Sequence, residues 1–423
     1  MKNNKRRMYN FLPLILFICT ISTNIFANKS VTTSDIYAQA LQTMQRSSET
    51  KTAFFASISC FIIDLKFTAK EEIKILELGN LHDSRFKVLD NLSEPGTVWK
   101  AFWKTLEPYN LPIFAVGNFD HQDCACNYLN KIGGLSFPSF SALKQNRFFQ
   151  KLAQKKSCSS LDKIANNKGI IVTRCSGENT QSKYTFKQEY PDFIIANMEI
   201  GKYARYKNQT CKIFDSPKLK KFRPRFGVYK KRYSKDLIRK IINDIHSDYY
   251  VIKPTNSFSG NGIIIIPEEE LDQTLKLILD DYNNNIVVKG SVYNPKIPLT
   301  LNYWKHDKNS RFIVEEFVES KYITIDGENY DATMRIIVAP RYDDDGKITL
   351  HLLDSYWKRP LKSIEKPGNF REKHISKHSP TYEESVGCLV NIEDRKKVEK
   401  ILEKIIPEIY WNALLHYYTE WSR

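Results

Sequence analysis

The spacing of apolar residues in the first half of the chain predicts strands that alternate with helices. Residues 58–67 and 73–78 are apolar, β-branched runs with charged turn residues between them, which predicts a β-hairpin. Residues 97–106 and 139–155 have apolar residues at helical spacing. Further strands are predicted at 113–116, 169–173 and 193–198. This alternation predicts an α/β layer with some parallel strand pairing.

In the second half, two apolar strands flank a loop of small polar residues. Residues 249–252 form the first strand and residues 263–266 the second, so the loop at 253–262 lies at the tip of a hairpin. Helices are predicted at 235–244, at 267–278 and, as a long amphipathic helix or a helix pair, at 391–421.

The first 27 residues have the pattern of a targeting segment. Basic residues precede an apolar run at 11–21, and Ile25-Phe26-Ala27 offers a cleavage site. The run is much shorter than the roughly 20 residues that span a bilayer, so it predicts a cleavable signal peptide and not a membrane anchor. We expect an exported protein, periplasmic or secreted, with no membrane span after residues 1–27 are removed.

The net charge of +16 favours an anionic partner, such as a nucleotide, an acidic peptide, nucleic acid or a membrane surface. A lysine-rich solubilising surface is the alternative interpretation. We find no aromatic-basic platform or nucleic-acid motif in the chain. One of the eight cysteines lies in the targeting segment, so the odd number that remains leaves at least one thiol unpaired unless chains pair.

The loop after Lys253 has the composition of a phosphate-binding loop. Small residues and the glycines Gly260 and Gly262 let backbone N–H groups approach phosphate oxygens closely. Lys253, at the end of a strand, supplies a positive charge. The loop differs from a Walker motif because no Gly-Lys-Ser/Thr closes it and a strand follows it. A solvated turn with a surface lysine is the alternative.

Three further motifs follow this loop in order along the chain. Glu315-Glu316-Phe317-Val318 ends a strand, the segment from Asp331 to Arg335 enters another strand, and Asp354 ends the predicted strand 348–353. In this order, the region from about Lys207 to His378 resembles the ATP-grasp superfamily of ATP-dependent ligases. The resemblance implies an α/β and α+β fold. An N-terminal Rossmann-like pre-ATP-grasp domain at 28–200 would precede a two-lobed ATP-grasp domain with a C-terminal helix at 201–423.

The resemblance also assigns roles to single residues. The backbone at 315–318 would contact the adenine edge, and Glu319 would bind the ribose hydroxyls. A second phosphate-binding lysine would be Lys212, with Lys207 and Lys218 as rivals. The implied nucleotide contacts are Lys212, Lys253, Ser259, Gly260, Gly262, Glu315, Glu316, Val318 and Glu319.

Asp331 and Arg335 are the implied catalytic residues. The arginine fork suits a γ-phosphate and an acyl-phosphate oxyanion because it donates several aligned hydrogen bonds. A structural ion pair between the two residues is the alternative. Magnesium prefers carboxylate oxygens, and the implied ligands are Asp354 and Glu372. The superfamily usually has Glu-x-Asn at the second position, whereas this chain has Glu372-Lys373-His374.

We therefore expect an ATP- and magnesium-dependent ligase that forms an amide or thioester bond through an acyl-phosphate. Its partners would be ATP, a carboxylate, and an amine or thiol. A nucleotide-binding module without ligase turnover is one alternative, and a basic anion-binding protein is another. Export conflicts with the scarcity of ATP outside cells unless the protein reaches another compartment that contains ATP.

Overall fold

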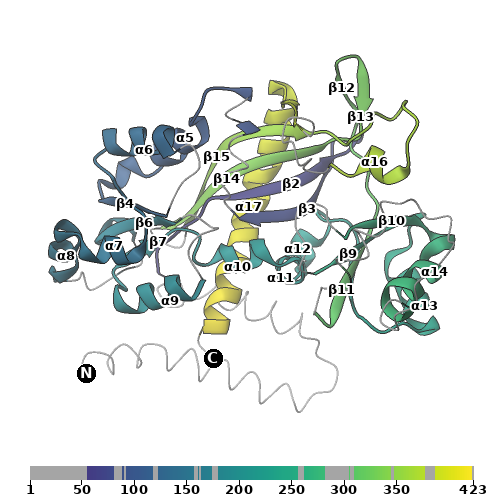
Figure 1. Cartoon of the computed structure of the whole chain (residues 1–423), viewed down its shortest axis with the longest axis horizontal. Helices are drawn as coiled ribbons and strands as arrows, with labels where there is room; N and C mark the ends of the chain where they lie inside the picture. Colours follow the sequence, from purple (N-terminus) through teal and green to yellow (C-terminus); the bar gives the residue numbers. More distant parts are fainter. Residues whose placement is uncertain are drawn as a thin grey trace, which may run out of the picture.

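The computed structural model describes residues 55–80, 88–89, 92–117, 122–156, 161, 163–173, 180–255, 262–281, 304, 309–343, 347–376 and 386–421. The predicted signal peptide lies outside these residues, as do Ser259 and Gly260 of the predicted phosphate loop. The described chain forms three larger sheets and a two-stranded ribbon, with helices packed around them (Figure 1). This mixed α/β architecture agrees with the expected fold class.

The central sheet is antiparallel and combines strands from distant parts of the chain. Its strand order is β16-β15-β14-β2-β3, and the short β1 also pairs with β14. The bounds are β1 (Ser57–Ile58), β2 (Phe61–Phe67), β3 (Ile73–Asn80), β14 (Thr333–Asp343), β15 (Lys347–Lys358) and β16 (Val386–Leu389). The first predicted hairpin is confirmed, since β2 pairs with β3.

A parallel sheet lies beside one end of the central sheet (Figure 1). Its strands, in spatial order, are β5 (Leu135–Phe137), β4 (Ile113–Val116), β6 (Gly169–Thr173) and β7 (Phe193–Ile195). The accompanying helices are α5 (Thr97–Lys104), α6 (Gln122–Lys131), α7 (Phe140–Gln145), α8 (Arg147–Gln154) and α9 (Thr180–Glu189). The predicted parallel pairing is confirmed.

The single helix predicted at 139–155 is two helices. Asn146 between them has extended backbone, and its side chain accepts a hydrogen bond from the backbone N–H of Phe149 at 3.0 Å. An asparagine that caps a helix in this way begins a new helix, because it satisfies one of the unpaired N–H groups of the first turn.

The third sheet is antiparallel and contains the predicted loop hairpin. Its strands, in spatial order, are β10 (Ile264–Pro267), β9 (Tyr249–Pro254), β11 (Arg311–Glu316) and β8 (Phe226–Lys230). Helices α13 (Lys235–Ile245) and α14 (Leu271–Lys276) accompany it. The pairing of β9 with β10 confirms the hairpin.

Shorter elements connect these sheets. They are α10 (Ile200–Arg205), α11 (Lys207–Ile213), α12 (Pro217–Lys220), the ribbon of β12 (Ile323–Ile325) and β13 (Glu328–Tyr330), and α16 (Phe370–His374). The long C-terminal helix is confirmed as α17 (Ile392–Trp421), which runs across the central sheet (Figure 1). Among the described helices, none is both long and apolar enough to cross a membrane.

The predicted domain boundary at residue 200 separates strands that share one sheet. Strand β2 lies between β3 and β14, with Ile63 opposite Ile336. A separate Rossmann-like domain over 28–200 therefore stays a prediction, and in the structure the two sides of this boundary share a hydrophobic core.

The two faces of β2 have different surroundings. Ile63 and Leu65 pack in a core that includes Ile406 of α17. The opposite face begins with Ile62, which packs near Trp99 of α5. Because side chains alternate along a strand, the polar residues that follow Ile62 on this face point away from α17.

Candidate functional site

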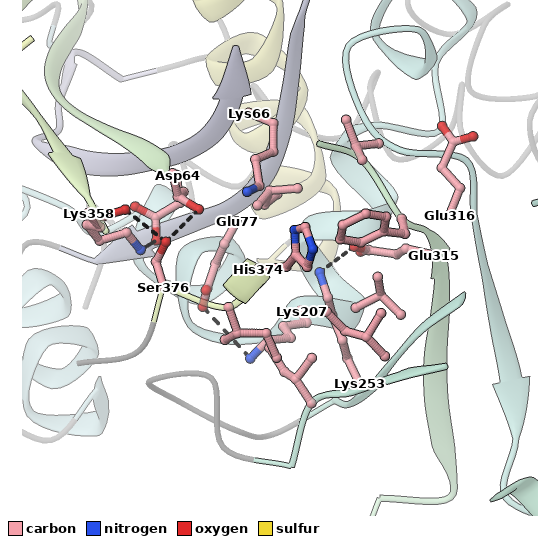
Figure 2. Close-up of a pocket in the computed structure, with 18 of the residues that line it drawn as sticks. Asp64, Lys66, Glu77, Lys207, Lys253, Glu315, Glu316, Lys358, His374 and Ser376 are labelled. Carbon is pink, nitrogen blue, oxygen red and sulfur yellow. Dashed lines mark hydrogen bonds and ion pairs between the residues drawn. The ribbon is translucent and has the colours of Figure 1, made fainter. Parts of the chain in front are cut away.

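A pocket opens between the central sheet and the sheet of β9, β10 and β11 (Figure 2). Strands β2, β3, β14 and β15 supply one wall, and α11 and the end of α16 contribute at the sides. The charged and histidine residues that line it are Asp64, Lys66, Glu77, Lys207, Lys253, Glu315, Glu316, Arg335, Lys358 and His374.

On the central-sheet wall, Asp64 binds two cations. Its carboxylate accepts hydrogen bonds from Nε and Nη2 of Arg335, each at 2.7 Å, and from Nζ of Lys358 at 2.6 Å. The Nη1 group of Arg335 also donates to the hydroxyl of Tyr356 at 3.3 Å. We call Asp64, Arg335 and Lys358 the floor cluster.

Strand register brings the floor cluster together. Arg335 of β14 lies directly opposite Asp64 of β2, and Tyr356 of β15 lies opposite Arg335. Directly opposed residues point to the same face of a sheet, so these three side chains form a row across it. Lys358 is two residues beyond Tyr356 on the same face.

Burial and charge shift the ionisation of this cluster. Burial by itself raises the pKa of Asp64, but the charges of Arg335 and Lys358 and their hydrogen bonds hold that pKa well below its usual range. For Lys358 burial has the larger effect, and together with the charge of Arg335 it lowers the pKa to about 8 despite the nearby Asp64. The net effect on the pKa differs in kind for Asp64 and Lys358, because the charge of Arg335 stabilises the carboxylate but repels the ammonium.

A comparable cluster of one carboxylate, one arginine and one lysine lies at the opposite wall, where Lys253 and Glu315 line the pocket. Glu315 of β11 accepts a hydrogen bond from Nη2 of Arg223 at 2.7 Å, and its other oxygen pairs with Nζ of Lys253. The side chains of Arg223, Lys253 and Glu315 are 2%, 8% and 1% exposed. Burial raises the pKa of Glu315, but the charges of Lys253 and Arg223 lower it further than burial raises it. We call these three residues the hairpin cluster.

A third network lies between these clusters. Asp331 is fully buried, and its Oδ1 accepts hydrogen bonds from Nζ of Lys66 and from the backbone N–H of Ser320, both at 2.7 Å. Its Oδ2 lies 2.8 Å from Nδ1 of His374. Asp331 does not line the pocket itself; it holds two pocket residues in place.

The segment after β11 and the apolar residues around it form a slot beside the hairpin cluster. Val251, Ile263, Ile265 and Ile375 contribute aliphatic surface to the pocket. The backbone of Phe317 donates to the carbonyl of Tyr249 at 3.0 Å, which fixes the path of the segment. Among the described residues, none accepts a hydrogen bond from the N–H of Val318.

The structure brings several predicted site residues together at the pocket. Lys253, Glu315, Glu316, Val318 and Arg335 all line it. The alternative prediction, an ion pair between Asp331 and Arg335, is wrong. Arg335 pairs with Asp64, because the two lie opposite each other on neighbouring strands.

Other predicted residues lie elsewhere. Lys212 is exposed on α11, whereas its rival Lys207 is buried, lines the pocket and lies 3.8 Å from Glu77. Glu319 is exposed, with an oxygen 3.9 Å from Nδ1 of His374. Gly262 has a φ of 73°, which suits glycine, and its carbonyl accepts a hydrogen bond from the indole of Trp304 at 2.8 Å.

The two predicted metal ligands do not line the pocket. Asp354 lies inside β15, not at a strand end as predicted, because the strand continues to Lys358. Its carboxylate accepts hydrogen bonds from the backbone of Ser355 at 2.7 Å and from Arg395 at 3.3 Å. Glu372 caps α16 together with Asn369 and lies 3.1 Å from Lys362.

Sequence reasoning missed Asp64, Lys66, Glu77 and Lys358. A signal for the first two was present, because they are charged residues two apart in an otherwise apolar strand, Phe61–Phe67. Charges at this spacing lie on one face of a strand and are buried there only with partners. No comparable signal marks Lys358, whose role depends on its distance from Asp64.

Comparison with known proteins gives weak structural similarity only. No protein-family model matches the chain, and no curated protein matches it. A protein assigned as gamma-glutamylcysteine synthetase from Methylobacillus flagellatus KT aligns with a TM-score of 0.43 and 9% identity, over 89% of this chain and 94% of its own.

Two further solved structures align over a smaller part of this chain. N5-carboxyaminoimidazole synthetase from Staphylococcus aureus, in complex with ADP, has a TM-score of 0.29 and 11% identity, over 74% of this chain and 96% of its own. D-alanine-D-alanine ligase from Coxiella burnetii has a TM-score of 0.28 and 7% identity, over 74% of this chain and 97% of its own. The function of this chain therefore has to be inferred from its own residues.

Proposed function

We propose that the chain is an ATP-dependent ligase that joins a carboxylate to an amine or a thiol through an acyl-phosphate. The observation that carries the proposal is the pocket between two sheets, in which Lys253 on one wall and Arg335 on the other are buried beside an aliphatic slot. Anionic phosphates would be bound by the cations, and an apolar base would fill the slot.

The wall of β9 and β11 would hold the nucleotide. Val251 and Ile265, which lie opposite each other on β9 and β10, would contact one face of the adenine ring, and the N–H of Val318 would donate to its edge. Lys253 and Lys207 would lie along the phosphate chain, where their ammonium groups act as point charges.

The central-sheet wall would act on the reacting groups. A carboxylate oxygen of the substrate would attack the γ-phosphorus, and ADP would leave as the bond to its bridging oxygen breaks. The amine or thiol, losing its proton, would then attack the acyl carbon, and inorganic phosphate would leave. Arg335 and Lys358 would neutralise the charge on the transferred phosphoryl group, so that catalysis rests on positioning and electrostatics.

Magnesium does not fit the described pocket residues. Of the four carboxylates that line the pocket, Asp64, Glu315 and Glu316 already bind arginine or lysine side chains, and Glu77 lies 3.8 Å from Lys207. Within the described ranges, no group of three or more metal-binding side chains comes together. The metal roles of Asp354 and Glu372 therefore stay predictions from the sequence resemblance, and no step above depends on them.

These engaged carboxylates favour a second candidate function, a module that binds nucleotide without turnover. An ADP-release assay on the purified full-length chain, with panels of amino acids, peptides and polyamines, separates the two. Release that depends on one acceptor supports the ligase. Tight ATP binding without release under any condition supports the binding module instead.

Lys253→Met should weaken ATP binding by about 1.5–3 kcal/mol, the scale of a hydrogen bond to a charged group, which is roughly tenfold to more than a hundredfold in Kd. The unfolding midpoint without nucleotide should change little, since Arg223 still neutralises Glu315. Calorimetric titration measures the affinity, and Lys240→Met, an exposed lysine on α13, is the matched control. Unchanged affinity in a folded Lys253→Met protein contradicts the phosphate role.

ATP affinity should fall as the pH rises through about 8, the pKa of Lys358 in the unliganded protein. Below that pH the ammonium is charged and attracts phosphate. Above that pH the ammonium loses its charge, and ATP affinity should fall by up to about tenfold per pH unit, which is the limit for one proton. The charged groups around Lys358 are Asp64 of β2, Arg335 of β14 and Glu77 of β3. Lys358→Arg should remove the dependence, and a flat wild-type profile between pH 7 and 9 (roughly one pH unit either side of that pKa) contradicts this assignment.

A further inference from the structure

Two buried clusters on opposite walls of the pocket have an excess of positive charge. The floor cluster and the hairpin cluster each contain one carboxylate and two basic side chains. In the floor cluster, the side chains of Asp64, Arg335 and Lys358 are 9%, 3% and 11% exposed. Figure 2 shows Asp64 with Lys358 on one side of the pocket and Glu315 with Lys253 on the other.

Among the residues that the structure describes, the surrounding carboxylates do not cancel this excess. Glu77, Asp331 and Glu316 each have a basic partner of their own, namely Lys207, Lys66 and Arg225. The three residues of each cluster therefore sum to a formal charge of one positive unit. Buried charge without a counter-charge is unfavourable, so an anionic ligand that reaches both walls would be stabilised by both clusters.

The same charges that favour an anion in this pocket disfavour a divalent cation. Magnesium binds carboxylate oxygens, but both oxygens of Asp64 and both oxygens of Glu315 accept hydrogen bonds from basic side chains. Glu77, the other carboxylate on the central-sheet wall, is a single ligand that already lies 3.8 Å from Lys207. A metal ion would have to displace Arg335 or Lys253 and would then lie among like charges. The carboxylates predicted as its ligands, Asp354 and Glu372, have other partners outside the pocket.

We infer that the pocket neutralises the phosphate chain of its nucleotide with side-chain cations and binds the nucleotide without a divalent metal. This inference rests on the proposed nucleotide site and makes it more specific. The floor cluster and the hairpin cluster take the place that a metal ion has in other phosphate sites. Free ATP carries two more negative charges than its magnesium complex, which matches the two excess positive charges of the clusters.

The test compares ATP affinity with and without metal. Calorimetric titration of the full-length protein is performed in excess EDTA and again in excess magnesium chloride. We expect the Kd in EDTA to be no more than about threefold weaker than the Kd in magnesium. A Kd at least tenfold weaker in EDTA overturns the inference and leaves the nucleotide site intact. Absence of binding in both buffers contradicts the proposed function itself.

Charge variants add a second measurement in the EDTA buffer. Lys358→Met leaves Asp64 paired with Arg335, so the fold should persist, and we expect its Kd for ATP to rise at least tenfold. Lys240→Met on α13 removes an exposed charge and should leave the Kd within twofold of wild type. Equal effects of the two variants would show that the clusters do not bind the phosphates and would overturn the inference.

Discussion

Asp64→Asn is expected to lower the free energy of unfolding by about 3–5 kcal/mol, the usual effect of removing one partner from a buried ion pair. The neutral amide leaves Arg335 and Lys358 buried without a counter-charge. Urea unfolding followed by circular dichroism measures the change. The matched control is Glu77→Gln on the neighbouring strand, because Glu77 is one-third exposed and lies 3.8 Å from Lys207; we expect it to change the stability by less than about 1 kcal/mol.

The same substitution should change the response to acid. The pKa of Asp64 is lowered in the folded protein, so its contribution is complete above the unfolded-state value of about 4 and is lost as the pH falls below it. The stability of the wild type should therefore fall more steeply than that of Asp64→Asn on acidification below about pH 4. A loss of less than 1 kcal/mol at neutral pH, or parallel acid profiles, would show that Asp64 does not hold the floor cluster together.

Arg335→Lys should reduce ADP release by about 10²–10³-fold, the loss seen when one donor to a developing charge is removed. The three N–H donors of lysine share one nitrogen, so lysine cannot reproduce the two parallel hydrogen bonds that Nε and Nη2 of Arg335 make to Asp64, and its charge would not be held in the same place. Single-turnover ADP release measures the step, and ATP affinity should weaken by no more than about tenfold.

Arg341→Lys is the control for this substitution. Arg341 is also buried in β14 but donates to the backbone carbonyl of Thr105, away from the pocket residues. We expect this variant to retain ADP release within about threefold of wild type. If Arg335→Lys and Arg341→Lys behave alike, the effect is structural and Arg335 does not act on the transferred phosphoryl group.

Local sequence patterns predicted several of the strands and helices, because these elements depend on neighbouring residues. The hairpins at 61–80 and 249–267 and the helix α17 follow from apolar spacing over short stretches. The break at Asn146 was missed because an asparagine can either continue a helix or adopt an extended backbone and cap the next one, and the apolar spacing does not distinguish the two.

The candidate site was predicted in part. The prediction was correct for Lys253 and for the segment after β11, which line the pocket. Each follows directly from a strand whose position the apolar pattern predicted. Asp354 was placed wrongly along its strand, since the apolar run ends at Leu353 while the backbone pairing continues to Lys358. Hydrogen bonds of a strand do not require apolar side chains, so the end of an apolar run is a poor guide to the end of a strand.

The sequence by itself determined the longer apolar strands, such as those at 61–67 and 249–254, and that the chain is rich in positive charge. The short strands β5, β8, β12, β13 and β16 were not predicted. Only the tertiary structure decided which charges meet. Asp64 and Arg335 are 271 residues apart, and they pair because β2 inserts beside β14 in one sheet. Such pairing depends on strand order and register between distant segments, and the short-range apolar pattern that forms each strand is compatible with many neighbours.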